Sequence, residues 1–140
     1  MNVELLKDAY QILAGIPAER FVRNLRMLVT ENSCNTLACG IGWLALYPYA
    51  PFERITLTPN QFTMLDGNIM DYDVIASKVF DLPLGKAFSL FVPRREVGFD
   101  GELLHNGLHL SDKALLLYRI RRILGQSEAV AYQHAKQDGK

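Results

Sequence analysis

The sequence lacks the features that mark several large classes of protein. Two cysteines in 140 residues are too few for the disulfide framework of a small secreted domain. Lysine plus arginine and aspartate plus glutamate both number 15, so the net charge favours neither a nucleic-acid partner nor a membrane surface. No apolar run reaches the roughly 18–20 residues that span a bilayer, and residues 1–8 lack the apolar core of a signal peptide. We therefore expect a soluble, reduced, intracellular protein without a membrane partner.

The composition is that of one folded domain. The chain has the length of a single domain, and its apolar share of 49% supplies enough side chains for a core. No internal repeat and no linker divides it. We expect a single domain over 1–140, with a frayed C-terminal tail at about 137–140.

The predicted centre of the fold is the run from 37 to 47, which contains no charged residue. A helix that is apolar on every face is normally surrounded by other helices. Gly40 and Gly42 each cost about 1 kcal/mol relative to alanine in a helix interior, and such a penalty indicates close approach by a neighbouring backbone. Cys39 and Trp43 are four residues apart, so they share one face and pack together.

Apolar residues at helical spacing predict further helices on both sides of this centre. The predicted fold class is mainly α: a compact bundle of about six short helices around the central apolar helix, with long irregular loops and at most one short strand pair. The run 54–58 alternates like a strand, but no obvious partner run lies nearby, so extended surface chain is favoured there. The flanking helices are expected over 3–14, 17–30, 73–80, 83–91, 112–124 and 128–136.

Arginines recur every third residue in the second predicted helix. Arg20, Arg23 and Arg26 form a basic strip, which is either a solvated face or an anion-binding strip that faces an acidic protein or a nucleic-acid backbone. Arg94 and Arg95 add basic charge in a later loop. These five arginines are the candidate partner-binding residues.

The predicted helix over 112–124 carries a second basic face. Its polar residues are Lys113, Arg119, Arg121 and Arg122, while acidic residues gather in the middle of the chain. A neutral chain that is polarised in this way can present one basic surface to phosphates. Dense basic stripes are absent, however, and binding to another protein explains the charge separation equally well.

Both cysteines and two histidines raise the question of a metal or thiol site. Cys34 and Cys39 with His105 and His109 supply four ligands of the types that zinc prefers, but the cysteine spacing does not match a structural zinc knuckle. A cysteine near a helix start, with either histidine as base, is the alternative of a thiol enzyme. Buried thiols that act as small apolar groups explain the pattern better. We therefore predict no catalytic residue, no bound metal and no cofactor.

Three stretches together resemble a group of small, uncharacterised phage and bacterial proteins. Residues 34–43 resemble their Cys-Gly-Thr-x-x-Cys-x-Ala-Gly-Trp/His element. Residues 80–82 and 87–91 are similar to their Leu-Gly-Leu…Ala-x-x-Leu-Phe segment. The predicted helix that contains Ala114 and residues 119–120 is similar to their closing Ala…Arg-Ile helix. The resemblance implies a phage or prophage accessory protein in the cytoplasm of a host cell. It brings no established catalytic residues.

The chain departs from that pattern at three positions. Asn35 and Asp81 each stand where the pattern has glycine. Since Asn and Asp are the residues that best tolerate a left-handed backbone, the local geometry is expected to survive both changes. Ile41 stands where the pattern has alanine. Its larger side chain leaves less room for the close helix–helix contact predicted in the run from 37 to 47.

The functional prediction is a non-enzymatic phage or prophage accessory protein that binds a host or phage macromolecule. A protein partner is favoured, and a nucleic acid is possible. One alternative is a zinc- or thiol-dependent enzyme that uses Cys34, Cys39, His105 and His109. The other is a nucleic-acid-binding protein that uses the strip of Arg20, Arg23 and Arg26.

Overall fold

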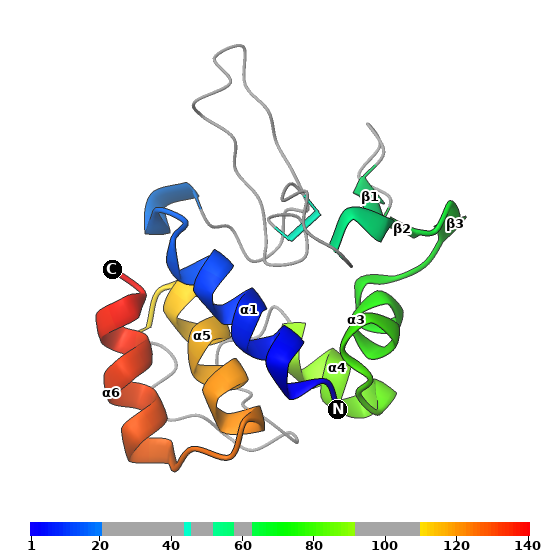
Figure 1. Ribbon diagram of the computed structural model, residues 1–140. Helices are drawn as coiled ribbons and strands as arrows, with labels where there is room; N and C mark the ends of the chain where they lie inside the picture. Colours follow the sequence, from blue (N-terminus) through cyan, green and yellow to red (C-terminus); the bar gives the residue numbers. More distant parts are fainter. Residues whose placement is uncertain (21–43, 46–51, 58–62, 92–109) are drawn as a thin grey trace.

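The computed structural model describes residues 1–20, 44–45, 52–57, 63–91 and 110–140 (Figure 1). The predicted fold class is confirmed, because this part of the chain is mainly helical with one small sheet. Two short 3₁₀ turns, η1 (Ala18–Arg20) and η3 (Phe52–Arg54), accompany the longer elements. The helices are α1 (Val3–Ala14), α3 (Tyr72–Phe80), α4 (Leu84–Phe91), α5 (Asp112–Ile123) and α6 (Glu128–Asp138), and the strands are β1 (Ile55–Leu57), β2 (Thr63–Leu65) and β3 (Asn68–Ile69).

The sheet corrects the prediction of at most one short strand pair. Its three strands run in the order β1-β2-β3, and both pairings are antiparallel. Ile55 lies opposite Leu65, and both are buried. Asp66 and Gly67 both have positive φ, 51° and 84°, which is the backbone of a two-residue hairpin turn. The partner of β1 escaped the sequence analysis because three residues are too few to show an alternating pattern.

Helices α6, α5 and α1 lie side by side, with α5 in the middle (Figure 1). Helix α1 runs antiparallel to α5, since Ala14 at its end contacts Lys113 and Tyr10 contacts Arg121. Helices α3 and α4 pack on each other, and α4 also contacts α5. Helix α5 therefore occupies the centre of the described helices. Of the predicted central helix over 37–47, only residues 44–45 fall within the described part, where Leu44 is helical and fully buried.

Two of the basic residues predicted on the surface of α5 are buried instead. Lys113 is 2% exposed and Arg119 3%. The ammonium of Lys113 donates to the carbonyl of Ala14, 2.7 Å away, and the Arg119 guanidinium donates to that of Leu90 at 3.5 Å. Carbonyls in the last turn of a helix have no partner within the helix and carry its negative dipole end. The two cations of α5 thus supply hydrogen-bond donors to carbonyls at the C-terminal ends of α1 and α4.

Helix α6 presents its smallest residues to α5. Ala131 and Ala135 are fully buried, and Gly139 continues the same stripe one turn later. A Cβ atom on Gly139 would lie 2.7 Å from the Cα of Ala114, a distance that real Cβ atoms do not adopt. The glycine therefore allows the end of α6 to touch the start of α5.

The ends of the helices follow ordinary capping chemistry. The side chains of Asn2, Ser111 and Ser127 accept the backbone N–H of Leu5, Ala114 and Val130 at 3.1, 3.1 and 3.4 Å. Such caps satisfy N–H groups that have no partner within the helix. Asp81 ends α3 with φ 53° and ψ 54°, so the left-handed geometry expected at this position is confirmed.

Helix α6 extends past the point where the sequence predicted fraying. It runs to Asp138, whereas the frayed tail was expected from about 137. Asp138 bonds to side chains of α1 and α5, and Gly139 accepts a bond from Ser111 through its carbonyl. These tertiary contacts order the last turn.

Candidate functional site

Most of the residues predicted to act on a partner lie outside the described residues. Arg20 is the exception: it ends the η1 turn, its backbone N–H donates to Pro17 at 3.0 Å, and its side chain is half-buried. The structure therefore does not test whether these residues come together. Outside the described residues lie the partner-binding candidates Arg23, Arg26, Arg94 and Arg95, and also the metal- or thiol-site candidates Cys34, Cys39, His105 and His109.

The described residues contain no arrangement of three or more His, Cys, Asp or Glu side chains that could hold a metal ion. Within the same part of the chain, no helix combines the length and the apolar character needed to cross a bilayer.

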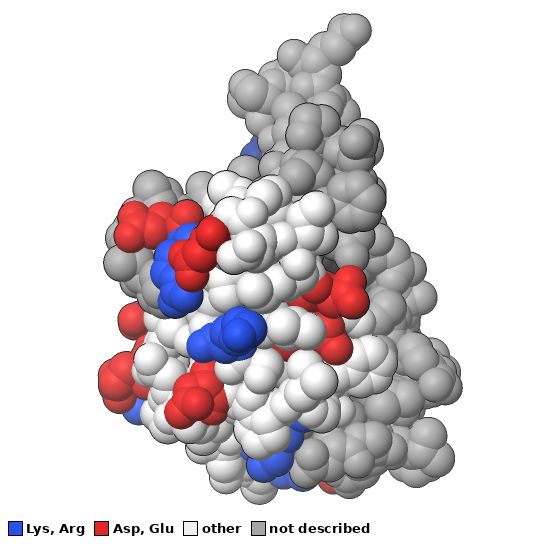
Figure 2. All heavy atoms as spheres, turned by 90° about the vertical axis from the view of Figure 1, so that its right-hand side faces the viewer, with Lys and Arg blue, Asp and Glu red and all other residues white. Residues whose placement is uncertain are grey.

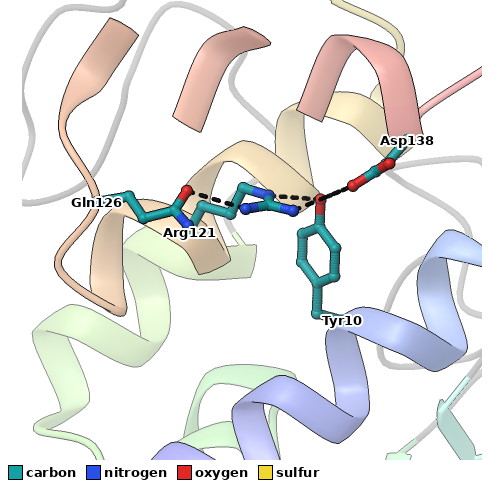
Figure 3. Close-up of polar contacts among 4 residues, drawn as sticks. All are labelled: Tyr10, Arg121, Gln126 and Asp138. Atoms are coloured by element: carbon teal, nitrogen blue, oxygen red, sulfur yellow. Dashed lines mark hydrogen bonds and ion pairs between the residues drawn. The ribbon is translucent and has the colours of Figure 1, made fainter. Parts of the chain in front are cut away.

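A polar cluster joins α1, α5 and α6, and we call it the Tyr10 cluster: Tyr10, Arg121, Gln126 and Asp138 (Figure 3). The Tyr10 hydroxyl accepts from Nε of Arg121 at 2.6 Å and donates to Oδ2 of Asp138. A second guanidinium nitrogen reaches the same carboxylate oxygen at 3.2 Å, and the third donates to the Gln126 side chain at 3.0 Å. One arginine thereby connects three helices and the loop that precedes α6.

The ionisation of the Tyr10 cluster is fixed around neutral pH. Burial, with the hydrogen bond to Asp138, raises the pKa of Tyr10 to about 12. The same hydrogen bond, with the nearby Arg121, holds the pKa of Asp138 below its usual range. Tyr10 therefore stays neutral and Asp138 stays charged, and neither is poised for general acid–base catalysis, which needs a pKa near the working pH. The arrangement is suited to holding helices together.

The sequence analysis did not identify this cluster, although part of its signal was present. Tyr10 lies four residues after Leu6 and three before Leu13, so helical spacing alone places it on the buried face of its helix. The sequence places Arg121 on the polar, basic face of its helix and Asp138 in a frayed tail. Arg121 and Asp138 lie on different helices, so the spacing of residues within one helix cannot show that they are in contact.

The surface feature that stands out is the apolar edge of α4, formed by Leu84 and Phe88. Their side chains are 52% and 47% exposed, and their i,i+4 spacing places them next to each other. Phe91, one turn further, is half-buried and stacks on the buried Phe80 with ring centroids 6.5 Å apart. The edge therefore adjoins the core through Phe91.

The visible face around the sheet, α3 and α4 shows no continuous basic patch among the described residues. Figure 2 shows acidic and basic side chains interspersed with wide uncharged areas. Arg54, the last residue of η3, pairs with Asp66 of the hairpin turn at 2.6 Å, so one of the cations on this face is paired with a carboxylate.

Comparison with protein-family models, curated proteins and solved structures finds no match to this chain. No activity is therefore carried over from a relative.

Proposed function

We propose that this chain is a non-enzymatic protein of phage or prophage origin that binds a host or phage protein in the host cytoplasm. The phage origin and the host location rest on the resemblance of residues 34–43, 80–82 and 87–91. The observation that supports a protein partner is the apolar edge of α4. Leu84 and Phe88 remain about half exposed, although each would gain free energy on leaving water. Aromatic side chains such as that of Phe88 are enriched at protein–protein interfaces.

The spacing of the edge fits one mode of recognition. Leu84, Phe88 and Phe91 stand at i, i+4 and i+7, which is the pattern of a helix that lies in an apolar groove of its partner. Phe91 is already engaged with Phe80, so Leu84 and Phe88 would supply the new contact. We therefore infer an apolar groove on the partner protein.

Burial of the basic residues of α5 supports a protein partner over a nucleic acid. Binding to nucleic acid is driven by accessible lysines and arginines that neutralise phosphates. Lys113 and Arg119 are buried, and Arg121 is engaged with Tyr10 and Asp138. Three of the four basic residues of α5 that suggested phosphate binding are thus used inside the protein. We propose that the basic strip of Arg20, Arg23 and Arg26 makes a secondary contact with the same partner protein.

Affinity capture with single-residue variants tests this proposal. Tagged wild-type protein is used to capture partners from host lysate, and the captured protein is identified by mass spectrometry and its Kd then measured. Leu84→Ala and Phe88→Ala each weaken binding by about 30-fold, the cost of losing an interface anchor. The matched control is Val130→Ala, because Val130 is 43% exposed but lies on α6, away from this edge. Its Kd should equal that of the wild type.

Other outcomes would contradict the proposal. Equal Kd values for wild type, Leu84→Ala and Phe88→Ala would exclude the α4 edge. Salt-sensitive retention on DNA that disappears when Arg20, Arg23 and Arg26 become alanine would establish nucleic-acid binding instead. Stoichiometric zinc that is lost in a folded Cys39→Ala variant would favour the metal site.

A further inference from the structure

We draw no further inference here: the strongest candidate, the surface patch on α4 where the exposed Gly85 lies beside Leu84 and Phe88, belongs to the edge already described as the partner contact, and nothing in the described residues shows what covers it.

Discussion

Helices α1 and α6 flank the same central helix, yet different forces hold them there. Helix α1 places Leu6, Tyr10 and Leu13 in the core, and full burial of one such leucine is worth about 1.5–3 kcal/mol. Helix α6 buries alanines, whose methyl groups are worth about 0.8 kcal/mol each. Its position depends on close backbone approach at Gly139 and on the Tyr10 cluster. Two helices that pack on the same neighbour can therefore contribute different amounts to the free energy of unfolding.

The largest expected effect on stability comes from removing a buried apolar side chain of α1. Leu13→Ala removes a fully buried side chain from α1 and should lower the free energy of unfolding by about 3 kcal/mol, through lost burial and the cavity that remains. Urea denaturation followed by circular dichroism measures the change. A loss below about 1 kcal/mol would show that α1 is not anchored by its core residues.

The next effect concerns the backbone contact of α6. Gly139→Ala should destabilise by about 2 kcal/mol, since overpacking forces the neighbouring backbone to move and the added Cβ would collide with Ala114. The control is Gly85→Ala in α4, where no atom lies within 4 Å of the added Cβ and the gain in helix propensity should stabilise by about 0.5–1 kcal/mol. If both substitutions shift the unfolding midpoint in the same direction, the close approach of α6 and α5 is wrong.

A further effect, which appears only at alkaline pH, is a pH dependence at Tyr10, the residue of α1 that bonds to Asp138 of α6. Tyr10 has a pKa of about 12 in the folded protein against about 10 in an unfolded chain. The folded state therefore holds this proton more tightly, and its contribution to stability is complete below about pH 10 and is lost as the pH rises towards 12. The difference in unfolding free energy between wild type and Tyr10→Phe should shrink by about 2 kcal/mol over that interval.

Asp138 gives the opposite dependence at acid pH. Its pKa is lowered by Tyr10 and Arg121, so its contribution is present above the usual aspartate pKa and is lost as the pH falls through the lowered value. Urea titrations at several pH values measure both limbs. A wild type and a Tyr10→Phe variant with parallel curves throughout would show that the cluster does not couple to folding.

Much of the fold could be predicted because its signals are local. Asn2, Ser111 and Ser127 cap helices with side chains that reach only three residues along the chain. Asp81 adopts the left-handed conformation that its resemblance to a glycine position suggested. Helical spacing of apolar residues likewise located α1, α3, α4, α5 and α6.

The functional surfaces were harder to predict because their signals are not local. The sequence indicated that α5 is amphipathic with a cationic face, and charge patterning alone cannot tell a solvated lysine from a buried one. Lys113 is buried because the last carbonyl of α1 lies 2.7 Å from its ammonium, and that carbonyl comes from a helix at the other end of the chain. The same reasoning applies to Leu84 and Phe88, because the spacing of apolar residues in a helix does not show which of them a neighbouring element covers.

The sequence by itself determined where α1, α3, α4 and α5 begin and end to within about a residue, which of their residues are apolar, and which turns need a left-handed backbone. Each of these depends on contacts within a few residues. Only the tertiary structure decided which charges are buried, why α6 stays ordered to Asp138, and which apolar residues remain in water. These outcomes depend on whether a partner compensates for the free energy of removing a group from water. That partner lies on another helix.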